Sequence, residues 1–164
     1  RALGQPRAEA LAARRLLEAV PGLRFVSVEP EPRFGRLCTA DVQAQLGQPV
    51  WDALIRDEIG RARAGGAEIL ATVYHGCQRL ICGFESEGAI TIEHYLSVFA
   101  RALGIEFEDR YKKFRLWQDP ERVLAESTPC QTVNHVDPER ARELVEKTFG
   151  RIPVAPGGEA AAAS

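Results

Sequence analysis

The chain has 164 residues, of which 45% are hydrophobic, 27% are charged and four are cysteines. A chain of this length buries about two-thirds of the surface that its unfolded form exposes, so folding alone requires neither a disulfide nor a metal. The formal net charge is -2 with basic and acidic residues interspersed, which argues against a nucleic-acid partner, and no apolar run approaches the about 18 residues of a membrane span.

The cysteines are few and unevenly spaced. Cys38, Cys77 and Cys82 fall near predicted strands, whereas Cys130 stands apart and is expected to be structural or free. This is unlike the dense disulfide framework of a small secreted protein, so we expect reduced thiols and a cytoplasmic location. Because the sequence starts at Arg1 and contains no methionine, we also expect that a longer protein continues upstream.

The first half of the chain predicts alternating helices and strands. Residues 6–20 are strong helix formers that begin at a proline and end at Pro-Gly, so they predict a helix. Residues 23–29 predict a strand that ends in a proline-rich loop at 30–36. Residues 50–64 predict a second helix, closed by two glycines. One face of this helix carries Trp51, Leu54, Ile55, Ile59 and Ala62.

The middle of the chain predicts parallel strands. Residues 67–74 form a nearly continuous apolar run, which is typical of a parallel strand covered on both faces. A short strand at 90–92 and a helix at 96–103, which stops at Gly104, follow it. The fold class is therefore α/β, with a small, mostly parallel sheet flanked by helices and joined by right-handed crossovers.

The last part of the chain predicts a helical extension. The tetrapeptide Asp-Pro-Glu-Arg occurs at 119–122 and again at 137–140, and each copy has the Asp, Pro and Glu of a helix start. We expect an α/β domain over 1–117, this extension over 118–152 and a disordered, low-complexity tail over 153–164.

Chemistry-bearing side chains follow the predicted strands. Cys77 and Cys82 come just after the strand at 67–74, and Cys38 comes after the loop that leaves the strand at 23–29. The ends of parallel strands share one edge of a sheet, where α/β proteins usually keep their sites. Thiolates are the preferred ligands of iron–sulfur clusters and of zinc, and His75 adds an imidazole beside Cys77.

Structural roles remain open for the same residues. Cysteine is among the most buried residue types, so Cys77 and Cys82 also suit a packed core. His75 suits a hydrogen bond to a backbone carbonyl, and Arg79 suits a solvated helix face. His94 starts a helix directly after a strand at the same predicted edge, which makes it a candidate to line a cofactor site.

Two stretches carry a resemblance to a known family. "GGAEILATVYHGCQRLICGFE" and "AITIEHYLSVFARALGIEFEDRYKKF" resemble the second half of the cysteine-rich domain found in heterodisulfide reductase and in the iron–sulfur subunits of glycolate and lactate oxidation systems. The shared features are a strand leading to Cys77, a short strand, His94, and a helix that ends in "ALG" at 102–104. Upstream, the loop with Cys38 is similar to the family's approach to its Cys-Cys-Gly motif, so the resemblance covers residues 1–117.

The sequence departs from the family pattern at several positions. The Cys-Cys-Gly motif appears as Leu-Cys-Thr at 37–39, and four residues rather than two separate Cys77 from Cys82. A further family cysteine would precede Arg1. These departures argue against the two-step disulfide cleavage of the family's active-site cluster and leave a simpler site.

The resemblance implies a four-iron four-sulfur cluster held by Cys38, Cys77 and Cys82, with His75 as a ligand or a neighbour of one. Arg79 would offset the negative charge of the cluster. The implied function is an iron–sulfur electron-transfer subunit of an oxidoreductase complex, in a hetero-oligomer with a flavoprotein or ferredoxin-type redox subunit.

Two rival functions remain open. In the first, the domain is a docking or structural subunit, and the same residues bind zinc or pack as a core. In the second, it is a thiol-disulfide enzyme that uses Cys77 and Cys82, which requires one thiol of low pKa.

Overall fold

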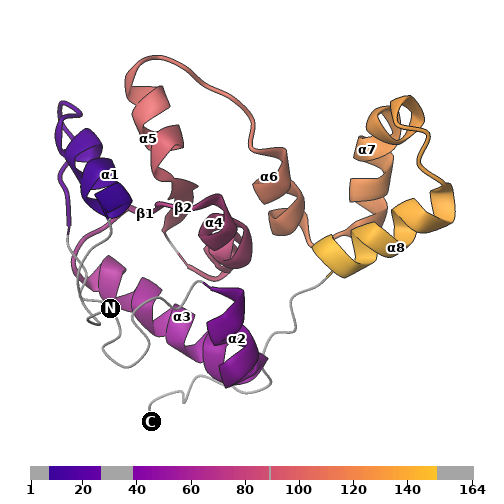
Figure 1. The fold of residues 1–164 in the computed structure, drawn as a ribbon, viewed down its shortest axis with the longest axis horizontal. Helices are drawn as coiled ribbons and strands as arrows, with labels where there is room; N and C mark the ends of the chain where they lie inside the picture. Colours follow the sequence, from indigo (N-terminus) through magenta and orange to yellow (C-terminus); the bar gives the residue numbers. More distant parts are fainter. Residues whose placement is uncertain (1–7, 27–38, 89, 151–164) are drawn as a thin grey trace, which may run out of the picture. The chain divides into compact units, whose positions relative to one another are not determined.

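The computed structural model of the chain describes residues 8–26, 39–88 and 90–150 (Figure 1). The chain divides into two compact units, Arg1–Leu116 and Trp117–Ser164, and each is described by itself. The elements are α1 (Ala8–Glu18), α2 (Ala40–Leu46), α3 (Gln48–Ala64), β1 (Ile69–Thr72), α4 (His75–Ile81), the 3-10 helix η1 (Cys82–Glu87), β2 (Thr91–His94), α5 (Tyr95–Ala102), α6 (Arg110–Trp117), α7 (Pro120–Val133) and α8 (Pro138–Phe149).

The sheet of the first unit consists of two parallel strands. β1 pairs with β2 in a register that places Ile69 beside Thr91 and Thr72 beside His94. Helices flank this small sheet, as Figure 1 shows. The predicted α/β fold class, with a small parallel sheet flanked by helices, is therefore confirmed, and both strands end at the same edge.

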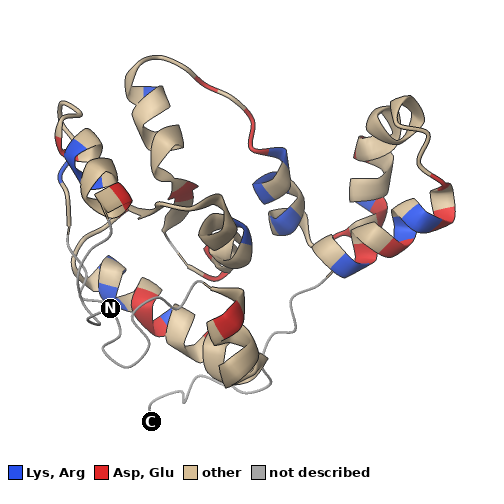
Figure 2. Ribbon diagram, viewed as in Figure 1, with Lys and Arg blue, Asp and Glu red and all other residues tan. Residues whose placement is uncertain are grey.

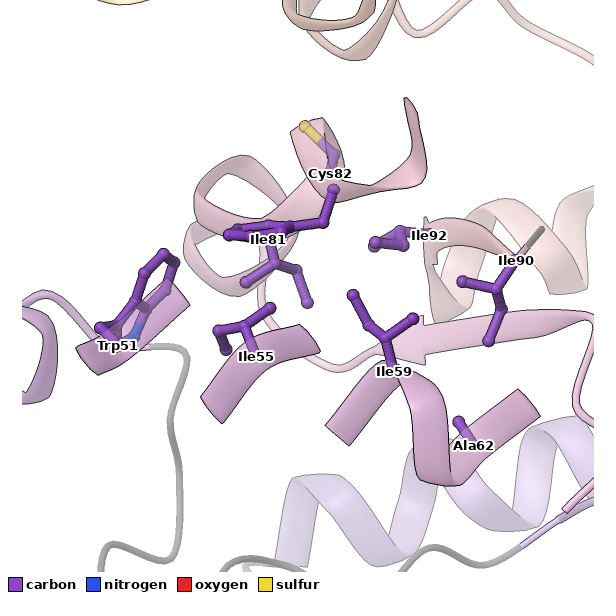
Figure 3. Close-up of a cluster of buried hydrophobic side chains, with 9 residues drawn as sticks. Trp51, Ile55, Ile59, Ala62, Ile81, Cys82, Ile90 and Ile92 are labelled. Atoms are coloured by element: carbon purple, nitrogen blue, oxygen red, sulfur yellow. The ribbon is translucent and has the colours of Figure 1, made fainter. Parts of the chain in front are cut away.

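The core of the first unit forms between α3 and the segment that runs from α4 to β2 (Figure 3). The indole ring of Trp51 meets the ring of Phe84 edge-on, with centroids 5.8 Å apart. Full burial of each large apolar side chain stabilises the fold by roughly 1.5–3 kcal/mol. The cluster comprises Trp51, Ile55, Ile59, Ala62, Ile81, Cys82, Phe84, Ile90 and Ile92, and Leu54 packs against it while half-buried.

A glycine turns the chain from α3 into β1. Gly66 has φ +80°, a left-handed conformation that other residues rarely adopt. Its N–H donates to the carbonyl of Arg63 at 2.8 Å, and the N–H of Ala67 donates to the carbonyl of Ala62 at 3.0 Å. This hydrogen-bond pair is a Schellman motif, and it satisfies carbonyl groups that the end of the helix leaves open.

The predicted strand at 23–29 is wrong for residues 23–26, which pair with no strand in the described part of the chain. Its remaining residues, like the predicted loop at 30–36, lie outside the described ranges. The Arg24 guanidinium instead donates to the carbonyl of Gly66 at 3.2 Å. Alternating apolar residues favour an extended backbone, but a strand also requires a partner distant in the sequence, which a local pattern does not supply.

The second unit pairs α7 with α8. The Asp119 carboxylate accepts a hydrogen bond from the Arg122 N–H at 3.1 Å, and the Asp137 carboxylate accepts one from the Arg140 N–H at 3.0 Å. Both predicted helix starts are therefore confirmed as aspartate caps followed by proline. The predicted disordered tail at 153–164 lies outside the described residues.

Charged side chains are spread over most of the described helices (Figure 2). α6 carries the densest run of basic residues, and acidic residues form ion pairs with two of them. Lys112 pairs with Glu85 at 2.7 Å, and Lys113 pairs with Glu108 at 2.7 Å. None of the helices in the described ranges combines the length and apolar character needed to cross a membrane.

Candidate functional site

The candidate site lies at the edge of the sheet where both strands end. β1 ends at Thr72 and leads into α4, which begins at His75, whereas β2 ends at His94, which caps α5. The parallel register brings these two ends together, and the rings of His75 and His94 stack with centroids 3.9 Å apart and planes at 17°. The sheet thus juxtaposes two imidazoles that are 19 positions apart in the sequence.

His94 uses both ring nitrogens within the fold. Its Nδ1 accepts a hydrogen bond from the Leu96 N–H at 3.3 Å, so the ring proton resides on Nε2, which donates to the Val73 carbonyl at 3.0 Å. Burial lowers the pKa of His94, the neighbouring His75 lowers it further, and the bond to Val73 opposes this shift. His94 is therefore a neutral capping residue with no lone pair left for a metal while both bonds hold.

His75 differs from its stacking partner. It is exposed at the start of α4. Its ring stacks on that of His94, and no other described residue forms a hydrogen bond or ion pair with its imidazole. Of the two histidines, His75 is the one whose chemistry is free for function.

Cys77 lies in the first turn of α4 and is only 7% exposed. It is disulfide-bonded. Cys82 and Cys130 are both free, so neither is its partner, and Cys38 lies outside the described residues. A sulfur of this domain therefore engages a second sulfur close to the edge where the two histidines stack.

A pocket of about 180 Å³ reaches Cys77. Its wall is mostly apolar, with Leu70 and Ile81 among the lining residues, and Glu58 adds a carboxyl group. Burial raises the pKa of Glu58, Arg61 lowers it, and Asp57 raises it. The pocket thus combines a disulfide sulfur with a carboxyl group that takes up a proton more readily than usual.

Sequence reasoning missed Glu58, although a signal was present. Glu58 lies three residues after Ile55 and four before Ala62, so it shares the buried stripe of its helix. An acidic residue on an otherwise apolar stripe points to a pocket or a partner, because burying a charge is costly.

Cys82 has a different environment from Cys77. It is 0% exposed within the hydrophobic core, and its thiol donates to the Arg79 carbonyl at 3.9 Å. In Figure 3 its sulfur points away from Ile55 and Ile92. Burial raises the pKa of the Cys82 thiol to about 11, more than the nearby charge of Arg115 lowers it. Cys82 is therefore a protonated thiol at neutral pH, whereas a metal ligand or nucleophile must be a thiolate.

Arg79 contacts α6. Its guanidinium lies over the ring of Tyr111, 4.5 Å from the centroid, in a cation–π contact. The Tyr111 hydroxyl in turn donates to the Arg79 carbonyl at 3.5 Å. Contacts between Arg79 and Tyr111 therefore hold α6 against α4.

No three histidine, cysteine or acidic residues within the described ranges are grouped so as to hold a metal ion. No family model matches the chain, and no curated protein or solved structure is significantly similar to it.

Proposed function

We propose that the chain is an iron–sulfur electron-transfer domain of an oxidoreductase complex, as its resemblance to the cysteine-rich domain of heterodisulfide reductase implies. One observation carries the proposal: Cys77 is bonded to a second sulfur at the carboxyl edge of the sheet, beside the available imidazole of His75. Sulfur donors that converge at a sheet edge are what a cluster site requires.

The donors at this edge fit part of a ligand set. Reduction of the disulfide would give Cys77 and its partner as two thiolate donors, and His75 would serve as a third ligand or as a hydrogen-bond donor to one. Cys82 does not fit as it lies, because its thiol is buried and protonated. A cluster bound here would supply one-electron transfer, and the family pattern assigns Cys38 to the set.

The partner in this proposal is a flavoprotein or a ferredoxin-type redox subunit, within a cytoplasmic hetero-oligomer. Two-electron donors such as flavins require a one-electron relay when the acceptor takes single electrons. The role of the chain is to place that relay at the end of two strands, where a partner can approach it.

Anaerobic reconstitution with ferrous iron and sulfide tests the proposal. We expect bound iron and acid-labile sulfide in comparable amounts, visible absorption, and a paramagnetic signal after reduction. A Cys77→Ser variant should lose most of the iron, whereas Cys130→Ser, which changes a free and exposed cysteine of the second unit, should retain it. If pre-reduced protein binds no iron under these conditions, the proposal is wrong.

A second candidate is thiol-disulfide chemistry without a cluster. The disulfide at Cys77 favours it, and the pocket beside Cys77 holds a carboxyl group, Glu58, that is suited to moving a proton. Cys82 is a poor second thiol for such a reaction, because its raised pKa leaves it protonated. Turnover of a small disulfide by iron-free protein would support this candidate.

Elemental analysis addresses the docking alternative. Zinc in stoichiometric amount without sulfide would favour a structural or docking subunit that uses Cys77 and His75 as ligands. Iron with sulfide would favour the electron-transfer domain.

A further inference from the structure

Two pockets of the first unit meet at Glu58. One is the pocket of about 180 Å³ that reaches Cys77, and the other is a larger pocket of about 490 Å³. Glu58, Leu70 and Ala71 line both of them, and all the lining residues belong to the described ranges. Sites for small molecules typically have volumes of about 300–1,000 Å³, so the larger pocket has room for a small organic ligand.

Most of the side chains that line the larger pocket are apolar. Leu17 of α1 and Val98 of α5 are only 5% and 7% exposed, and Leu23 and Phe25 line the pocket from the segment that follows α1. Burying apolar ligand surface against such a wall is favourable. The wall therefore favours a ligand with an apolar body.

The charged side chains of the larger pocket are Arg24, Glu58 and Glu68, which together carry one net negative charge. The Arg24 guanidinium already donates to the Gly66 carbonyl at 3.2 Å, and Glu68 is exposed. Glu58 is half-buried, and its carboxylate forms no hydrogen bond or ion pair with any described residue. The pocket thus presents an acceptor for a positively charged donor.

The fold compensates the charge of Glu58 only in part. Burial raises the pKa of Glu58, and the nearby charge of Arg61 lowers it to a smaller extent. The Arg61 guanidinium pairs with the Asp57 carboxylate at 3.0 Å. Because burying a carboxylate is costly unless it is paired and hydrogen-bonded, a cationic donor that enters the pocket would stabilise the charged form.

We propose that the larger pocket binds a small primary amine with an apolar body, whose ammonium group pairs with the Glu58 carboxylate. Ammonium supplies charge-assisted hydrogen bonds to the carboxylate, and the apolar body lies against Leu17 and Val98. A metal ion fits less well, because no three histidine, cysteine or acidic residues of the described ranges are grouped to hold one. This inference goes beyond the proposed function and does not depend on a cluster.

A ligand series of one shape and three charges tests the proposal. The full chain is titrated with phenylethylamine, phenylethanol and phenylpropanoate, and binding is followed by calorimetry and by ligand-observed NMR. We expect saturable binding of the amine, about tenfold or more tighter than that of the alcohol, and no binding of the carboxylate. Equal affinity for amine and alcohol, preference for the carboxylate, or no binding of the amine overturns the proposal.

Three variants locate the site. Glu58→Gln keeps the size of the side chain and removes its charge, so affinity for the amine should fall about tenfold or more while affinity for the alcohol stays unchanged. Ala71→Ile enlarges an exposed residue that lines both pockets, and it should weaken binding of amine and alcohol alike. Glu106→Gln, at an exposed carboxylate of the same unit that lines neither pocket, is the matched control and should bind as the parent does.

Urea midpoints show whether each variant is folded before its binding is compared. Amine binding that survives in folded Glu58→Gln overturns the assignment of the carboxylate. A last titration uses N-acetyl-lysinamide, which carries the same ammonium group on a polar body and represents a lysine side chain of a protein. Weaker binding than that of phenylethylamine supports a free amine as the ligand, and tighter binding overturns it.

Discussion

At the scale of single residues, the two cysteines of the 75–85 segment differ in chemical state because different residues surround their sulfur atoms. Cys77 borders a pocket and is oxidised, whereas Cys82 is enclosed by the core and keeps its proton. The sequence shows two thiols five positions apart. Only the packing of α4 and η1 against neighbouring elements distinguishes the sulfur that borders a pocket from the thiol that is enclosed in the core.

This difference predicts selective alkylation. In folded protein at pH 7, iodoacetamide should modify exposed Cys130 and spare Cys82 by at least a hundredfold in rate, because the buried thiol is protonated and out of reach. In denaturant both should react at similar rates. Mass spectrometry of the time course measures this, and modification of Cys82 at the rate of Cys130 in folded protein would contradict the burial of its thiol.

His94 predicts a pH dependence of stability. Its folded-state pKa lies below the ordinary value near 6.5, so the unfolded chain binds the additional proton first as the pH falls. The stability contributed by neutral His94 is present above about pH 6.5 and is lost as the pH falls through the folded-state pKa. Protonation at Nδ1 also breaks the hydrogen bond from the Leu96 N–H that caps α5.

Urea unfolding at pH 8, 7, 6 and 5 measures this dependence. A His94→Gln variant should be less stable at pH 8 and should lose less stability between pH 7 and pH 5 than the parent protein. His135→Gln removes an exposed histidine of the second unit and serves as the control. This variant should lose as much stability between pH 7 and pH 5 as the parent protein does. If His94→Gln loses as much stability between pH 7 and pH 5 as the parent protein, His94 is not the cause of the pH dependence.

At the scale of elements, α3 and its C-terminal turn contain two glycines with opposite roles. Gly60 lies in the helix interior, exposed and with open space where a Cβ would point, whereas Gly66 follows the helix at φ +80°. Alanine favours a helix interior over glycine by about 0.8–1.0 kcal/mol, but it is strained in a left-handed conformation.

We therefore expect Gly60→Ala to raise the free energy of unfolding by about 0.5–1 kcal/mol and Gly66→Ala to lower it by about 1 kcal/mol or more. The Gly66 change also brings a Cβ to 3.0 Å from the Arg24 guanidinium, although that side chain can move away. Urea midpoints of the two variants measure the effect. Shifts of the same sign in both would contradict a helix that ends in a left-handed turn at Gly66.

At the scale of the whole first unit, a two-stranded sheet is too small to be stable alone, so its edge depends on the helices packed against it. Ile92 of β2 is 0% exposed and belongs to the same cluster as Ile55 of α3. It thereby joins the strand that ends at His94 to the longest described helix of the unit.

Ile92→Ala should cost about 2–5 kcal/mol of unfolding free energy, because it leaves a cavity between strand and helix. Val50→Ala, at a side chain 51% exposed, is the matched control and should change stability by less than about 0.5 kcal/mol. Chemical denaturation of both variants provides the comparison. Equal costs would show that this cluster does not hold the strand.

The sequence by itself determined the features that depend on neighbours along the chain. The caps at Asp119 and Asp137, the buried stripe of α3 and the two strands follow from residue types at short spacing, because capping and periodicity act within one or two turns. The continuous apolar run of β1 also predicted a parallel arrangement of the strands, although not their register.

Only the tertiary structure decided which side chains meet. It left residues 23–26 without a strand partner among the described residues, stacked His75 on His94, buried Cys82 and placed Glu58 in the pocket of Cys77. Each of these outcomes depends on contacts between segments far apart in the chain and on the water those contacts exclude. Burial and pairing are properties of the packed molecule, so no local pattern specifies them.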